Sequence, residues 1–106
     1  MHSFCSALGI AHLALGQYEE GLRWAEGALR ENSGLPALRL KLSLCGHLGR
    51  IREAQDCLRR MREIGAEPTI AALAGDLPKG LAPAIAARLT EGLRKAGVPE
   101  GEAIPS

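Results

Sequence analysis

A stretch of seven residues near the start of the chain recurs 33 residues later, and this spacing constrains the fold more than any other feature. Residues 16–22 read GQYEEGL and residues 49–55 read GRIREAQ. Both begin with a glycine, a polar residue and a large apolar residue, and both continue to a glutamate followed by a small residue. A repeat of this length is typical of one supersecondary unit that stacks on a copy of itself.

Apolar residues recur at helical spacing on both sides of each of these glycines. The clearest series are Tyr18, Leu22, Ala25 and Leu29, then Leu38, Leu42, Cys45 and Leu48, then Ile51, Ala54, Leu58 and Met61. These intervals of three and four residues predict helices rather than strands. We expect helices over residues 3–15, 18–31, 36–48, 51–64, 69–76 and 82–96. The glycines at the turns suit left-handed helix ends, and the short connections predict antiparallel neighbours.

The composition supports an all-α fold and excludes several functional classes. The chain has 17 leucines and 17 alanines but a single valine, and Leu and Ala are strong helix formers. A net charge of +1 argues against a nucleic-acid binder that works through bulk charge. No apolar run approaches the ~20 residues of a membrane span. Three cysteines without a CxxC pair favour reduced thiols and a cytoplasmic location.

The predicted helices divide the chain into three parts. Residues 1–66 form two helical hairpins, residues 67–97 supply C-terminal capping helices, and residues 98–106 form a flexible tail. Thr69 is the expected N-cap of the first capping helix, and Pro83 fits the first turn of the second.

The first hairpin resembles a tetratricopeptide repeat (TPR), whose pattern is W-x2-L-G-x2-Y, then A-x3-F, then P. It reads Cys5-x2-Leu8-Gly9-x2-His12, and Ala54-x3-Leu58 of the second hairpin follows the second part of the pattern. The resemblance implies a TPR-like α-solenoid of antiparallel helix pairs. In such arrays the first helix of each pair lines a concave face that binds proteins.

A narrower resemblance covers more of the chain. Three segments are similar to the C-terminal repeat regions of bacterial class III adenylate or guanylate cyclases. They are residues 11–26, Leu48-Gly49-Arg50 with Glu53-Ala54, and a tail that comprises residues 69–71, 77–78 and 91–100. This implies that the chain is the C-terminal part of a larger bacterial signalling protein. The cyclase domain itself is absent from the sequence, and its activity is not carried over.

We find no pattern that predicts catalysis, so we expect a protein that is not an enzyme. The sequence has no Gly-rich phosphate loop and no HExxH motif. Cys45 and His47 are two residues apart on one helix and therefore point in different directions. No ligand spacing supports a metal site from His12, Cys45 and His47. No cofactor is predicted, and the arginines over residues 50–62 alternate with acidic residues as on a solvated helix face.

The leading hypothesis is a non-catalytic scaffold that binds a protein or peptide on its concave face. The residues placed on that face are Ser6, Ile10, Leu13, Arg39, Ser43 and His47. Arg39 would pair with a carboxylate of the partner. We consider two interpretations of Trp24. Its side chain packs against the neighbouring helix, or it is an aromatic anchor at an interface.

Two alternatives remain open. Uncapped N-terminal helices, with Phe4, Leu8 and Leu15 partly bare, would suit a homodimerisation module for an upstream effector domain. A small regulatory ligand could instead bind near His47.

Overall fold

The computed structural model describes residues 4–31, 34–75, 77 and 80–101, and these form an all-α fold. The helices in this part of the chain are α1 (Phe4–Ala14), α2 (Tyr18–Glu31), α3 (Leu35–Leu48), α4 (Ile51–Glu63), α5 (Ile70–Gly75) and α6 (Pro83–Lys95). They match the helices predicted from the spacing to within about one residue. The ends predicted at residues 3 and 76 lie outside the described residues.

The two repeated glycines end α1 and α3 in the same way. Gly16 and Gly49 have φ values of 77° and 74°, in the left-handed region that favours glycine. The N–H of Gly49 donates to the carbonyl oxygen of Gly46, and the N–H of Arg50 donates to that of Cys45 at 2.9 Å. This pair of hydrogen bonds is the Schellman motif, and it turns the chain back so that α4 follows α3 in an antiparallel hairpin.

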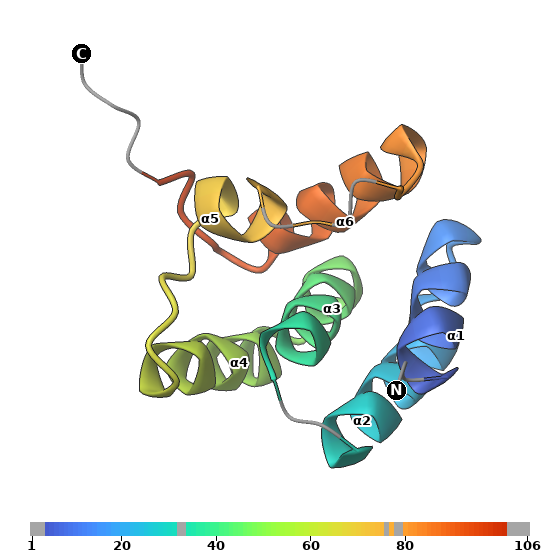
Figure 1. Ribbon diagram of the computed structural model, residues 1–106, viewed down its shortest axis with the longest axis horizontal. Coiled ribbons are helices and arrows are strands. Elements are labelled where there is room, and N and C mark those ends of the chain that lie inside the picture. The colour runs from blue at the N-terminus through green and yellow to red at the C-terminus, as the bar shows by residue number, and fades with distance from the viewer. Residues whose placement is uncertain (1–3, 32–33, 76, 78–79, 102–106) are drawn as a thin grey trace.

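Helix α3 lies in the middle of the molecule (Figure 1). It packs between α2 and α4, and α6 packs across its remaining face. Almost every residue from Ala37 to Gly46 is therefore buried. A helix enclosed in this way needs apolar or small residues all round, and the run Leu38, Leu40, Leu42 and Leu44 supplies them.

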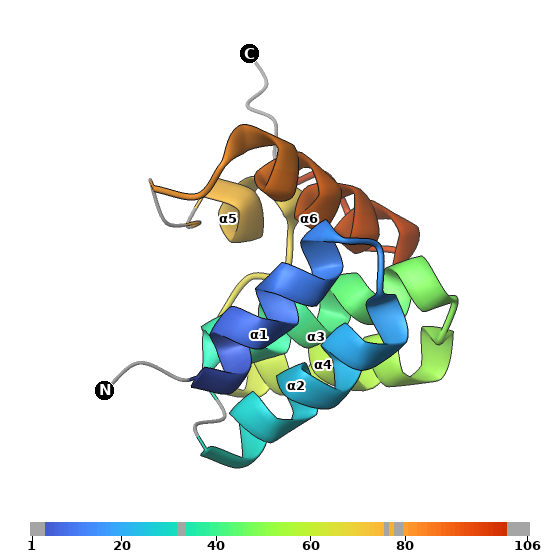
Figure 2. The ribbon, with the colours of Figure 1, turned by 90° about the vertical axis from the view of Figure 1, so that its right-hand side faces the viewer.

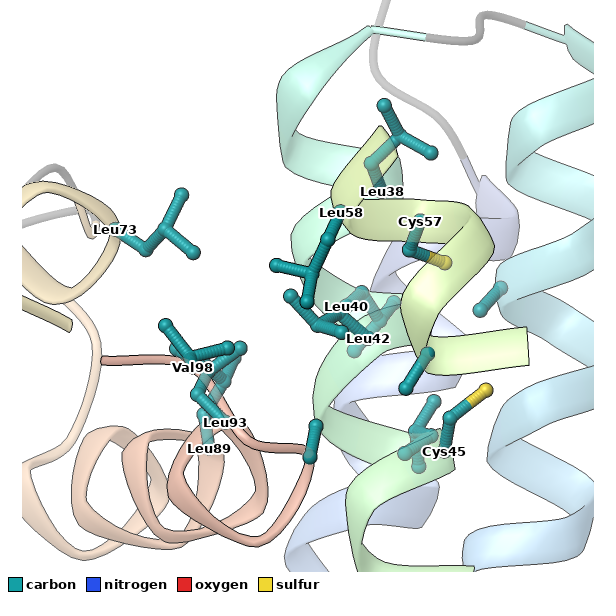
Figure 3. Packing of buried hydrophobic residues seen from close by; sticks show 14 of the residues in the cluster. Leu38, Leu40, Leu42, Cys45, Cys57, Leu58, Leu73, Leu89, Leu93 and Val98 are labelled. Carbon is teal, nitrogen blue, oxygen red and sulfur yellow. The ribbon is translucent and has the colours of Figure 1, made fainter. Parts of the chain in front are cut away.

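The core joins both ends of the chain to this central helix. Figure 3 shows leucines of α6 and Leu73 of α5 pointing toward the leucines of α3 and α4. Leu42, Leu44 and Leu93 have no solvent-accessible surface, and Leu89 is 2% exposed. Burial of one leucine side chain contributes about 2 kcal/mol, so the C-terminal helices are a substantial part of the core. None of the helices in the described residues combines the length and apolar character needed to cross a membrane.

The C-terminal segment is tied together at its two ends, and we call its described residues 69–75, 77 and 80–101 the clasp. The N–H groups of Ile70 and Ala71 donate to the carbonyl oxygens of Pro99 and Glu100 at 2.8 and 3.0 Å. The Thr69 hydroxyl accepts from the N–H of Ala72 at 3.1 Å, as expected for an N-cap.

The C-terminal end of the clasp, where the predicted tail begins, contacts the rest of the chain. Val98 is 5% exposed and belongs to the core. Arg94 and Glu100 form a charged pair with two hydrogen bonds, and these bonds lower the pKa of the Glu100 carboxyl. Val98 is therefore packed and Glu100 is held at the surface by Arg94, whereas residues 102–106 of the predicted tail lie outside the described part of the chain.

Helices α3 and α6 cross at two glycines with almost no space between their backbones. A Cβ on Gly46 would overlap the carbonyl oxygen of Gly92 and lie 2.8 Å from the amide nitrogen of Ala96. A Cβ on Gly92 would overlap the backbone and hydroxyl of Ser43. Each Cβ would meet at least one main-chain atom, so small side-chain movements alone cannot relieve the overlap. This crossing requires glycine on both helices.

We predict that Gly46→Ala lowers the free energy of unfolding by about 3 kcal/mol, because the added methyl forces the two helices apart. Gly75→Ala is the matched control, since a Cβ at Gly75 meets nothing within 4 Å. That substitution should be neutral or stabilise by up to about 1 kcal/mol. Urea unfolding followed by circular dichroism measures both. Equal effects of the two substitutions would contradict the close crossing.

Candidate functional site

The three residues of α3 assigned to the concave face share one side of the helix, and that side faces the clasp. Ser43 has no accessible surface, Arg39 is 6% exposed, and His47 is half-buried. Arg39, Ser43 and His47 therefore share one face of α3. The face is covered by α5 and α6, so a peptide cannot reach it while the clasp is docked (Figure 1).

Ser43 and His47 bind the backbone of α6 rather than its side chains. The Ser43 hydroxyl donates to the carbonyl oxygen of Leu89 at 2.7 Å. Nε2 of His47 donates to the carbonyl oxygen of Arg88 at 2.8 Å. Gly92 lies four residues after Arg88 and three after Leu89, where a longer side chain would shield these two oxygens. We call Ser43, Gly46 and His47 the cradle.

The imidazole of His47 is fixed from its other side by α2. The rings of Tyr18 and His47 stack with their centroids 4.3 Å apart and their planes 3° from parallel. Tyr18 belongs to the repeated segment that follows Gly16, so the first turn of α2 orients a cradle residue. The imidazole therefore packs between α2 and α6.

Arg39 contacts the end of α5. Its Nη1 donates to the carbonyl oxygen of Leu73 at 3.4 Å. Leu73 lies in the last turn of α5, where carbonyl groups lack helical partners and basic side chains are favourable. This contact helps to hold α5 against α3, and the expected pairing with a partner's carboxylate stays a prediction.

The three α1 residues assigned to the same face differ in their exposure. Leu13 is fully buried, and Ser6 and Ile10 are half-buried. Helix α6 also reaches α1, because Nη1 of Arg88 donates to the carbonyl oxygen of Ala14 at 3.4 Å. Leu13 therefore belongs to the core, and the α1 part of the predicted concave face borders α6.

Trp24 lies on the side of α2 that packs against α1. It is three residues from both Gly21 and Gly27, and Cβ atoms at those glycines would contact His12 and Cys5 of α1. Trp24 is half-buried, a position consistent with packing against the neighbouring helix. Its part as an interface anchor remains a hypothesis.

The opposite side of α1 carries an apolar surface that nothing in the described chain covers. Ala7 and Ala11 are exposed, Leu8 is half-buried, and Leu15 is 69% exposed. We call these four residues the outward face of α1. The helix contains no Asp, Glu, Lys or Arg, so the whole surface is uncharged. The sequence analysis noted Leu8 and Leu15, and the structure adds the two alanines between them.

We next consider the remaining polar groups and the pocket in the described residues. No three His, Cys, Asp or Glu side chains of that part of the chain are grouped closely enough to hold a metal ion. Nδ1 of His12 is 2.7 Å from Oε1 of Gln17 in its own turn. A pocket of about 170 Å³ is lined by Leu38, Arg60, Glu63 and Ile64. Sites for small molecules are usually about 300–1,000 Å³.

The comparisons with known proteins identify no relative. No family model matches the chain, and neither the curated proteins nor the solved structures contain a match. The class of protein that the structure defines is thus an all-helical domain whose central helix is enclosed by its own C-terminal segment.

The two buried cysteines behave as small apolar residues. Burial, together with the nearby thiol of Cys57, raises the pKa of Cys45 to about 12, and burial raises that of Cys57 to about 11. Both thiols are free. Because the thiolate is the nucleophile, these cysteines are unreactive at neutral pH.

We predict that these thiols make the fold sensitive to alkaline pH. Their ordinary pKa is 9.0, so above that value the unfolded chain loses protons that the folded chain retains. Stability is therefore complete below pH 9 and falls as the pH rises toward the folded pKa values. Unfolding in urea should show a smaller loss between pH 7 and about pH 10.5 for Cys45→Ala/Cys57→Ala than for the wild type. An identical loss would contradict the assigned burial.

Proposed function

We propose that this protein is a non-catalytic, TPR-like helical scaffold that mediates protein–protein contact through the outward face of α1. The observation that carries the proposal is the uncharged apolar stripe of Ala7, Leu8, Ala11 and Leu15. The exposed faces of α2 and α4, by contrast, carry ion pairs such as Arg23–Glu20 and Arg59–Glu63. A helix that is apolar all round normally has a covering element on every side.

The proposed partner surface is a helix with its own apolar stripe. Ala7 and Ala11 are one turn apart and leave room for a close approach, while Leu8 and Leu15 supply apolar area beside them. An upstream helical hairpin of a larger signalling protein, as the resemblance to cyclase repeat regions implies, would have this chemistry. The TPR-like reading is supported by the matched helix ends at Gly16 and Gly49.

Site-specific photocrosslinking in the producing cell tests this proposal. A photoreactive residue at position 11 should give discrete protein adducts, because the outward face contacts the partner. The same residue at position 87 is the control, since Ala87 is an exposed alanine on the outer side of α6. Adducts of equal yield from both positions, or none from position 11, would refute the assigned surface.

A second candidate, a homodimerisation module, is favoured by the same stripe. Two antiparallel copies of an uncharged face meet without placing like charges together. Ala11→Arg adds a charge there and should leave the free energy of unfolding within about 0.5 kcal/mol of the wild type, since Ala11 is exposed. Sedimentation velocity over a concentration series should show association in the wild type and in Ala87→Arg, and none in Ala11→Arg. A wild type that stays monomeric throughout would reject the homodimer.

A further inference from the structure

The outward face of α1 has a counterpart on α3. Helices α1 and α3 hold the same place in the two hairpins, since each is followed by a left-handed glycine, Gly16 or Gly49, and a second helix. The α3 residues that lie one 33-residue repeat after the four residues of the outward face are Leu40, Lys41, Leu44 and Leu48. On α1 this face is uncovered, and Figure 2 shows the outer side of α1 in front of α3 and α4. The contacts of α3 therefore indicate what such a face binds.

Helix α3 contacts both helices of the hairpin that precedes it. A Cβ on Gly9 of α1 would lie 2.7 Å from Cδ2 of Leu40. A Cβ on Gly21 of α2 would lie 2.9 Å from Cδ2 of Leu44. The two leucines thus occupy the space that two glycines leave, one on each helix of the hairpin. This face of α3 is matched to a pair of antiparallel helices rather than to a single helix.

The outward face of α1 is shallower than its counterpart on α3. Ala7 stands at the position of Leu40, and Ala11 stands at the position of Leu44. A hairpin that docks on α1 in the same way therefore has room for side chains at the places where α3 meets glycine. Because packed interfaces leave few voids, we expect residues larger than glycine at those two places of the partner.

The outward face also differs from its counterpart in charge. On α3, Nζ of Lys41 lies 3.8 Å from Oε2 of Glu26 on α2. Leu8 stands at the position of Lys41 and offers no charge to a carboxylate. Burying an acidic side chain against Leu8 would remove it from water without a compensating partner. The docked hairpin is therefore expected to carry an apolar residue at the place of Glu26.

The second hairpin of another copy of this chain does not meet these requirements. Helix α4 has Arg59 one repeat after Glu26, and the Arg59 side chain is 62% exposed. Arg62, which is also exposed, stands at the position of Leu29, an α2 residue that packs against the core. Docking α4 on α1 would press these guanidinium groups against Leu8 and the rest of an uncharged face.

From these observations we propose that the outward face of α1 binds a helical hairpin of a second, different protein, docked as the first hairpin of this chain is docked on α3. The inference rests on the proposed scaffold function and specifies its partner. The partner supplies two consecutive antiparallel helices, side chains larger than glycine against Ala7 and Ala11, and an apolar residue against Leu8. Its face is thus complementary to the outward face in both size and charge.

Photoreactive residues at positions 7 and 11, placed in separate full-length chains, test the hairpin. Adducts formed in the producing cell are digested, and the labelled partner residues are identified by mass spectrometry. Gly9 and Gly21, the contacts of the equivalent α3 residues, lie on different helices and are 12 residues apart in the sequence. The two positions together should therefore label two consecutive helices of one partner, at sites about 12 residues apart.

The other outcomes separate this inference from the proposed function. Labels confined to one helix of the partner would overturn the hairpin while the scaffold function stands. Labels in a second copy of this chain would overturn the inference in favour of the homodimer. Absence of adducts from both positions would refute the scaffold function and the inference with it.

Leu8→Lys tests the apolar requirement, because it gives α1 the residue that α3 has at this position. With the photoreactive residue at position 11, the substitution should lower the adduct yield about tenfold, since the partner offers no carboxylate to the ammonium group. Leu8→Met keeps an apolar side chain and should retain the yield. Ala87→Lys, on the exposed outer side of α6, is the control for an added charge.

Urea unfolding followed by circular dichroism establishes that each variant is folded at the temperature of the crosslinking. An unchanged or higher yield from folded Leu8→Lys would mean that the partner carries a carboxylate at this place, and it would overturn the assigned chemistry. Equal losses from Leu8→Lys and Ala87→Lys would do the same, because the effect would then not depend on the outward face.

Discussion

The arrangement of the molecule depends on the backbone contact between Gly46 of α3 and Gly92 of α6. Glycine within a helix lowers the free energy of unfolding by about 1 kcal/mol relative to alanine. Here the contacts that the close approach of the two helices allows offset this cost. Only at this distance can Ser43 and His47 reach the carbonyl groups of α6. The burial of the α6 leucines and the position of α5 follow from the same contact, since both elements are carried by the clasp.

This contact also decides which surfaces remain for partners. The face of α3 that a helical repeat would offer to a peptide is occupied by the chain's own C-terminal segment. On that face Arg39 donates a hydrogen bond to the end of α5. The uncharged outward face of α1 is left uncovered, and it is the basis of the proposed scaffold function. The α3 face thus binds the chain's own C-terminal segment, and the outward face of α1 is available for association.

The helices and their turns could be predicted from the sequence because their signals are local. Gly16 and Gly49 adopt the left-handed angles expected of helix ends, and Thr69 caps α5 as expected. The place of α6 could not be predicted, since it rests on a contact between residues 46 positions apart. Two signals were present in Gly46 and Gly92, which stand inside otherwise regular helices, where glycine often marks a close approach. The spacing correctly grouped Arg39, Ser43 and His47 on one face, but spacing within a helix does not specify what packs against that face.

The central claim is that α6 lies directly on α3 at this pair of glycines, and nuclear Overhauser spectroscopy of the wild-type chain tests it most directly. The Cα protons of Gly46 lie next to the amide of Ala96, because a Cβ at that position would be 2.8 Å from its nitrogen. We expect a strong cross-peak between a Gly46 Cα proton and the Ala96 amide proton. If that cross-peak is absent while α3 and α6 are both helical, the clasp does not cover α3, and the contact between Gly46 and Gly92 is contradicted.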